Sequence, residues 1–172
     1  MLGSWQHLAM RFHAEHRFDG SAPAVAALLA DPAFYLGLTL PDLSKPELLG
    51  QGENGGASRL RLRYEFIGSL DPMAKRLIGS DRLGWVQEVS IDRVAGSGVL
   101  RFAAERDARR LHGSADFVLT EVGGDTIRHL DGELVVAVPG IGRMAERRIV
   151  PGILRRMDIE AEALNDRLGQ GG

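Results

Sequence analysis

The chain has 172 residues, of which 44% are hydrophobic and 26% are charged, a balance typical of one soluble globular domain with a substantial core. Its formal net charge of -2 gives no electrostatic reason to expect nucleic-acid binding. The absence of cysteine excludes disulfides, thiolate metal sites and cysteine nucleophiles together.

The segment that ends at Phe18 carries apolar side chains at every second position, which predicts a strand with one buried face. Phe12 and His16 lie on that face. Two short helices are expected next, over residues 24–30 and 33–38. A serine that can cap the first helix precedes it, and an Asp-Pro pair separates the two.

A succession of short alternating segments separated by glycine-rich turns then predicts a series of antiparallel strands. The expected strands span residues 47–53, 58–67, 85–92, 99–105, 111–121 and 126–138. A short helix over 72–78 interrupts the series. The alternation puts Tyr64 and Phe66 on the same face as Trp85 and Gln87, whereas a row of arginines occupies the outer face.

From Ile141 to about Leu168 the apolar period becomes helical, which predicts one long amphipathic helix. Pro151 and Gly152 lie inside it, so we expect a kink or a short break there.

The order of these elements predicts an α+β helix-grip fold over residues 1–172 as a single domain. A curved antiparallel sheet of about six or seven strands would wrap around the long C-terminal helix, with two short helices after the first strand. Such a fold encloses concave apolar space, where small ligands bind.

Two segments resemble the START-like (SRPBCC) superfamily, which includes polyketide cyclases, lipid-transfer domains and the birch-pollen-allergen type. The first segment is the His-Arg-Phe-Asp sequence at 16–19, followed at 24–34 by a short helix, an Asp-Pro pair and an aromatic residue. The second segment covers residues 131–139 and leads into the final helix. The resemblance covers residues 16–168 and is strongest to an uncharacterised branch. It implies binding of sterols, lipids, polyketides or other apolar molecules, although some members catalyse cyclisation, dehydration or hydrolysis. No catalytic motif is common to them, so none can be carried over.

Four side chains on the expected inner face are polar or amphipathic, namely His16, Tyr64, Trp85 and Gln87. Each could orient a ligand. His16 could also act as an acid or base, or simply form a local hydrogen bond at the strand end. The aromatic pair could equally be core, and Gln87 could hold a buried water.

Other charged groups point to a solvated surface. His129, Asp131 and Glu133 alternate opposite the apolar positions of their strand, as do His7, His13 and Glu15 on theirs, which favours an outer face over a metal site. Arginine pairs at 147–148 and 155–156 flank Pro151. One of each pair could reach an anionic head group, although such side chains usually keep their charge in water.

The sequence therefore predicts a non-enzymatic module that binds or carries a small hydrophobic ligand of lipid, isoprenoid or polyketide type. The expected ligand-binding residues are Phe12, His16, Tyr64, Phe66, Trp85, Gln87, Phe102, Phe117, Met144 and Met157. One alternative is a cyclase-like or dehydratase-like enzyme that uses His16 or Gln87. Another is a protein-interaction domain with a vestigial cavity and an exposed apolar patch around residues 149–153.

We expect no cofactor, no metal and no nucleic-acid partner, and a homodimer is left open. No apolar run is long enough to span a bilayer, and residues 1–10 lack the pattern of a secretion signal. A cytoplasmic location without stable membrane insertion is therefore expected.

Overall fold

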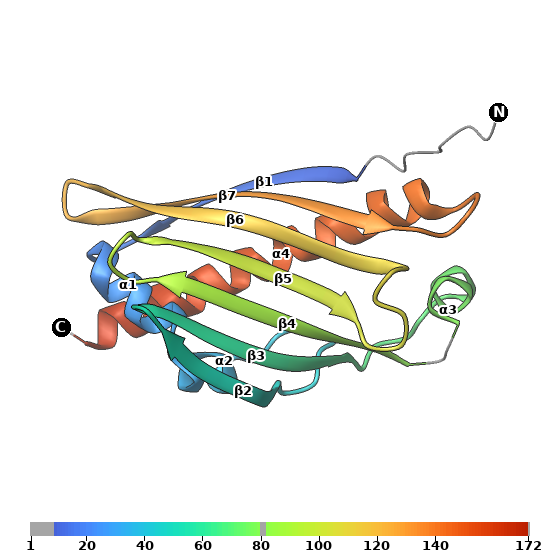
Figure 1. Cartoon of the computed structure of the whole chain (residues 1–172), viewed down its shortest axis with the longest axis horizontal. Coiled ribbons are helices and arrows are strands. Elements are labelled where there is room, and N and C mark those ends of the chain that lie inside the picture. Colours follow the sequence, from blue (N-terminus) through green and yellow to red (C-terminus); the bar gives the residue numbers. More distant parts are fainter. Residues whose placement is uncertain (1–8, 80–81, 172) are drawn as a thin grey trace.

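A computed structural model describes residues 9–79 and 82–171 and consists of a seven-stranded antiparallel sheet with a long helix across one face (Figure 1). The strand order is β1-β7-β6-β5-β4-β3-β2, so β1 and β2 are the edges. The strands are β1 (Met10–Phe18), β2 (Glu47–Asn54), β3 (Ala57–Phe66), β4 (Leu83–Asp92), β5 (Ser97–Ala104), β6 (Leu111–Val122) and β7 (Asp125–Val136). The helices are α1 (Ala22–Leu29), α2 (Pro32–Gly37), α3 (Pro72–Ile78) and α4 (Gly142–Gln170).

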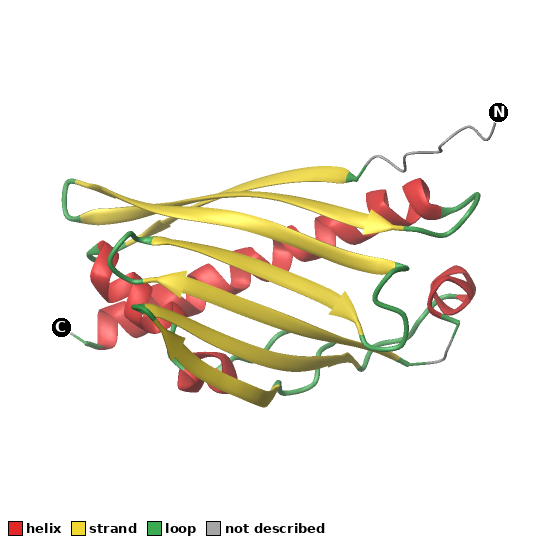
Figure 2. Cartoon of the chain, in the orientation of Figure 1, coloured by secondary structure: helices red, strands yellow, loops and turns green. Residues whose placement is uncertain are grey.

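The predicted helix-grip fold is confirmed, with the short helices α1 and α2 after the first strand and α4 at the end of the chain (Figure 2). Each of the three short helices has a proline in its first turn and a polar residue before it. Those caps are Ser21, Asp31 and Asp71, whose side-chain oxygens accept hydrogen bonds from the first-turn amides. Local sequence therefore sets where these helices begin.

Helix α4 is continuous through Pro151 and Gly152. Of the two predicted outcomes, a kink or a short break, the structure excludes the break. A proline inside a helix removes one backbone donor, which leaves the carbonyl four residues earlier, that of Arg147, without its helical partner. Pro151 and Arg147 are both exposed. Water can satisfy that carbonyl, which allows the helix to continue past the proline.

The inner face of the sheet contains three phenylalanine rings that lie over glycines of the neighbouring strand. The directly opposed pairs are Phe12–Gly132, Phe102–Gly113 and Phe117–Gly98. A Cβ added at Gly98 would lie 2.3 Å from Cζ of Phe117, and one at Gly132 would lie 2.4 Å from Cζ of Phe12. The β1–β7 register runs through Gly132 without a shift, so this glycine makes room for a ring and does not form a bulge.

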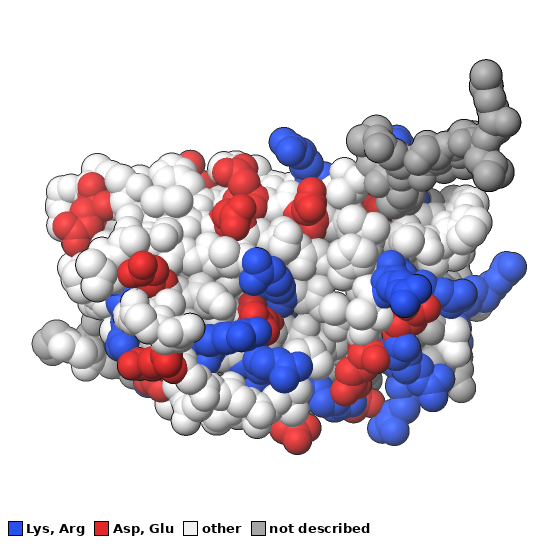
Figure 3. Space-filling model, in the orientation of Figure 1, with Lys and Arg blue, Asp and Glu red and all other residues white. Residues whose placement is uncertain are grey.

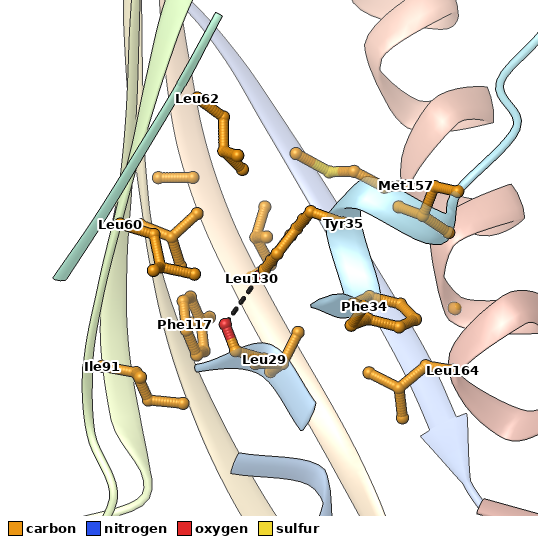
Figure 4. Close-up of a cluster of buried hydrophobic side chains, with 14 of the residues drawn as sticks. Leu29, Phe34, Tyr35, Leu60, Leu62, Ile91, Phe117, Leu130, Met157 and Leu164 are labelled. Atoms are coloured by element: carbon orange, nitrogen blue, oxygen red, sulfur yellow. Dashed lines mark hydrogen bonds between the residues drawn. The ribbon is translucent and has the colours of Figure 1, made fainter. Parts of the chain in front are cut away.

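The core lies between the sheet and the layer formed by α1, α2 and α4 (Figure 4). Tyr35 of α2 is fully buried there, and its hydroxyl donates to the carbonyl oxygen of Leu29 at 2.8 Å. Met157 and Leu164 of α4 pack from the other side. The short helices are thereby fixed against both α4 and the sheet.

Basic and acidic side chains are interspersed over the outer face of the sheet (Figure 3). Arg59 donates to Glu88 at 2.7 Å, and Arg63 donates to Glu105 at 2.6 Å. These cross-strand pairs balance the arginine row of β3. Within residues 9–79 and 82–171, no helix is long and apolar enough to cross a membrane.

Candidate functional site

A pocket of about 420 Å³ lies between the inner face of the sheet and α4. The sheet contributes mainly apolar side chains from β4, β5, β6 and β7, and α4 closes the pocket with a row that includes Ile149, Ile153 and Met157. Leu29 and Tyr35 form the end nearest α1 and α2. The volume is in the range of pockets that hold small ligands.

The pocket reaches the surface between α4 and the segment that links α2 to β2. Pro41 and Asp42 of that segment and Gly152 of α4 line the pocket and are exposed. The segment is fixed to β3 because the amide of Ser44 donates to the carbonyl of Glu65 at 2.9 Å. An adjoining pocket of about 400 Å³ near α3 shares six wall residues with the first: Phe66, Leu83, Ala104, Leu111, Arg148 and Ile149.

Arg156 of α4 forms a stack with two aromatic rings at the wall of the pocket. Its guanidinium carbon lies 4.4 Å from the centre of the Tyr64 ring and 5.8 Å from that of Trp85. The two rings are cross-strand partners and lie nearly parallel, with centres 5.7 Å apart. The guanidinium also donates to Oε1 of Gln87, which is buried and lines the pocket. Three polar or aromatic groups thus hold one arginine at a mainly apolar wall.

Arg128 of β7 is buried and belongs to a network with β1 and α4. It donates to Glu160 at 3.3 Å and to Nδ1 of His16 at 3.1 Å, and it lies over the ring of Phe18. Because arginine can only donate, Nδ1 of His16 is the acceptor, and Nε2 carries the proton that is donated to Asp158 at 2.9 Å. His16 is therefore neutral in this arrangement. The Arg128 Nε has no partner among the described residues.

Burial governs the ionisation of these groups. It lowers the pKa of His16, and the positive charge of Arg128 acts in the same direction, while Asp158 opposes both. Burial also raises the pKa of Tyr64 and of Tyr35 above the ordinary tyrosine value. The network is thus built to hold an uncharged imidazole between a cation and two carboxylates.

Six of the ten residues expected to bind a ligand line this pocket: Phe66, Trp85, Gln87, Phe102, Phe117 and Met157. Tyr64 is fully buried and stacks on Trp85, but it is not part of the pocket wall. Phe12 is buried over Gly132, away from the pocket. His16 is held in the Arg128 network and does not line the pocket either.

Met144 differs most from expectation, because half of its side chain is exposed and it does not line the pocket. The reason is the rotation of α4 at its start. Glu146 is buried there and accepts a hydrogen bond from the amide of Val136 at 3.0 Å. Two helical positions are separated by about 200°, so Met144 points away from the sheet.

Sequence reasoning missed Arg128 and Glu160, and it did not single out Arg156 from its neighbours. Arg128 shares the strand parity of Leu130, which was expected to be buried, and a charged residue at such a position is a signal that could have identified it. Glu160 is three residues from Met157 on the apolar side of the helix. The pairing of the two could not be read from either segment alone.

The histidines and acids of the outer face form pairs across strands. His13 contacts Asp131 at 2.9 Å, and His129 contacts Glu15 at 3.3 Å. Among the residues that the structure describes, no group of three or more histidine or acidic side chains is arranged to hold a metal ion. His7, which was expected on the same face, lies outside the described residues.

Solved structures of other proteins share this architecture. A START superfamily protein from Mycobacterium smegmatis is 14% identical, with a TM-score of 0.56 over 94% of this chain and 99% of that one. An aromatase/cyclase (ZhuI) from Streptomyces sp. R1128 is 16% identical, with a TM-score of 0.63 over 93% of each chain. Norcoclaurine synthase from Thalictrum flavum, solved with dopamine and hydroxybenzaldehyde, is 16% identical, with a TM-score of 0.65 over 96% of this chain and 89% of that one.

The chain therefore has the helix-grip fold of these START-like proteins. Within that class it belongs to the family described as "Protein of unknown function (DUF2505)", which matches residues 13–168. No functionally curated protein matches its sequence.

Proposed function

We propose that this protein binds or carries a small hydrophobic molecule, of lipid, isoprenoid or polyketide type, in the pocket between the sheet and α4. The observation that carries the proposal is a pocket of about 420 Å³ whose walls are mainly aliphatic and aromatic. Burying apolar ligand surface there contributes about 25 cal/mol for each Å² removed from water. The few polar groups at the pocket wall can orient a ligand that is held mainly by apolar contacts.

Comparison with other proteins of this fold supports the same use of the pocket. The Thalictrum enzyme was solved with two small aromatic molecules, and the Streptomyces protein is an aromatase/cyclase. Both share the fold at low identity, so their ligands indicate a class of chemistry for this chain and no particular compound.

Catalysis by the same pocket is the less favoured candidate. Gln87 and Arg156 meet at the wall, as an enzyme would require. However, the carboxylate of Glu160 is already paired with Arg128, and His16 does not line the pocket. The arrangement offers groups that bind more readily than groups that transfer protons.

The first experiment is native mass spectrometry of protein purified gently from its own host, followed by extraction and identification of any bound molecule. A stoichiometric apolar ligand supports the proposal. The covalent structure of an added ligand before and after incubation, determined by chromatography and NMR, also separates the two candidates, since a carrier returns the ligand unchanged and an enzyme does not.

A matched pair of variants tests whether binding occurs in this pocket. Ala104 lines both adjoining pockets, whereas Ala103, the preceding residue of β5, alternates to the other face of the sheet. We expect Ala104→Phe to weaken binding of the neutral fluorescent probe N-phenyl-1-naphthylamine by about tenfold, because it occupies space that the probe needs. Ala103→Phe leaves probe binding unchanged. Equal binding by both variants would place the probe elsewhere and contradict the proposal.

A further inference from the structure

Arg156 stands out among the charged side chains that line the pocket because it is half-buried without an acidic partner. Arg128 is paired with Glu160, and Arg148 is paired with Asp71 at 3.3 Å. The contacts of Arg156 are the two aromatic faces and the oxygen of Gln87. Among the residues that the structure describes, no carboxylate forms an ion pair with it.

Most of the hydrogen-bond donors of the Arg156 guanidinium are not used by the described side chains around it. Arginine carries five N–H groups in a planar fork, and within residues 9–79 and 82–171 the one side chain that accepts a hydrogen bond of good geometry from it is Gln87. Because Gln87 accepts through its oxygen, its amide nitrogen is the atom left to donate. The hydroxyl of Tyr64 is fully buried and makes no hydrogen bond of good geometry among the described residues, although it lies close enough to Arg156 for the two to interact. Unpaired donors next to a desolvated cation are costly unless an acceptor with negative charge joins them.

Three of the charged residues that line the pocket, Asp42, Arg148 and Arg155, are exposed and keep their charge in water. Among the buried and half-buried ones, Arg128 and Glu160 cancel each other, and the positive charge of Arg156 remains. A single negative charge balances the site, whereas a phosphate dianion would leave an excess of negative charge in apolar surroundings. The planar fork of arginine also fits the two oxygens of a carboxylate.

We infer that the ligand is an apolar molecule with one carboxylate, and that Arg156 is the residue that recognises that carboxylate. This inference rests on the proposed function. The carboxylate accepts from the guanidinium, which Tyr64, Trp85 and Gln87 hold at the wall. The apolar body of the ligand lies against side chains such as Leu100 and Phe102 of β5.

The test compares ligands that differ only in charge. Dodecanoate and 1-dodecanol form one pair, and 2-naphthoate and 2-naphthalenemethanol form another, each measured at pH 8 by displacement of the neutral N-phenyl-1-naphthylamine probe. We expect at least one acid to bind about tenfold or more tightly than its alcohol, as a charge-assisted hydrogen bond requires. Arg156→Gln is expected to abolish that preference and to leave the affinity for the alcohol within about twofold.

The matched control is Arg147→Gln, an exposed arginine of the same helix that does not line either pocket. It is expected to leave both affinities unchanged. Equal binding of acid and alcohol by the native protein overturns the inference and leaves the proposed function intact. The same holds if Arg156→Gln weakens both ligands equally. Failure of the native protein to bind any of the four ligands or the neutral probe overturns both proposals together.

Discussion

The buried pair of Arg128 and Glu160 gives a quantitative prediction about stability. The Arg128 side chain is 4% exposed and that of Glu160 is 12% exposed. Replacing Arg128 by methionine leaves a carboxylate at the pocket wall without its cation and removes the donor to His16. Loss of one partner of a buried ion pair costs about 3–5 kcal/mol. We expect about 3 kcal/mol for Arg128→Met, because the residual exposure of Glu160 to the pocket lets water solvate it.

The reasoning is tested by a double-mutant cycle with urea unfolding followed by tryptophan fluorescence. Glu160→Leu alone leaves Arg128, whose side chain is 4% exposed, without its carboxylate, at a cost of about 3–5 kcal/mol. The double variant Arg128→Met/Glu160→Leu removes both charges, and we expect its loss to be about 3 kcal/mol less than the sum of the two single losses. Simple additivity would refute the idea that the two charges stabilise each other. As a control, Arg59→Gln removes an exposed ion pair with Glu88 and leaves the unfolding midpoint unchanged.

Three other measurements test particular features of the fold. Burial lowers the pKa of His16 below its ordinary value of 6.5. As the pH falls, the unfolded chain therefore binds a proton at this residue before the folded chain does. The contribution of His16 to stability is complete above pH 6.5 and is lost as the pH falls below it. His16→Gln can keep both hydrogen bonds without titrating, and we expect its unfolding midpoint to fall less than that of the native protein between pH 7.5 and 5.5; parallel curves would contradict this. Gly98→Ala is expected to lower the free energy of unfolding by about 2 kcal/mol, because its Cβ would lie 2.3 Å from Phe117 Cζ and 2.5 Å from the carbonyl oxygen of Ser90, which cannot easily move. Gly52→Ala meets nothing within 4 Å and is expected to change stability by less than about 0.5 kcal/mol, so similar losses in the two variants would exclude the steric explanation. Tyr64→Phe removes an unpaired buried hydroxyl and is expected to raise the free energy of unfolding of the ligand-free protein by about 1 kcal/mol, whereas a loss of that size would mean that the hydroxyl has a partner.

Local pattern was enough to predict the architecture. Alternation with period two identified most of the strands, and glycine-rich turns marked those over residues 47–53 and 99–105. The shift to a helical period at Ile141 identified α4. Strand parity also put Gln87 and Trp85 on the inner face. When the apolar residues of a strand face the core, every residue of the same parity faces the core too, including a polar one such as Gln87. These features depend on residues that are close in the sequence.

The polar part of the site depends on contacts between distant segments and could not be predicted in the same way. His16 was expected to bind locally or to face a ligand, but its partners are 112 and 142 positions away along the chain. The helical pattern shows which residues share a stripe, but it does not show where on that stripe the sheet ends, so Met144 and Arg156 could not be distinguished. Only the packed structure shows that Arg156 lies over Tyr64.

The phenylalanine rings that lie over glycines have a consequence for how such a pocket changes during evolution. A phenylalanine ring that lies over a glycine of the neighbouring strand occupies the place of the absent side chain. The ring then extends less far toward α4, so these glycines contribute to the volume of the pocket. A mutation at Gly98 or Gly113 disturbs the sheet and the pocket at once. New ligand preferences are therefore more accessible through the helical wall, where Ile149, Ile153 and Ile159 can change size without disturbing a strand. We therefore expect the sheet to stay constant among related proteins, and the residues of α4 to determine differences in ligand selectivity.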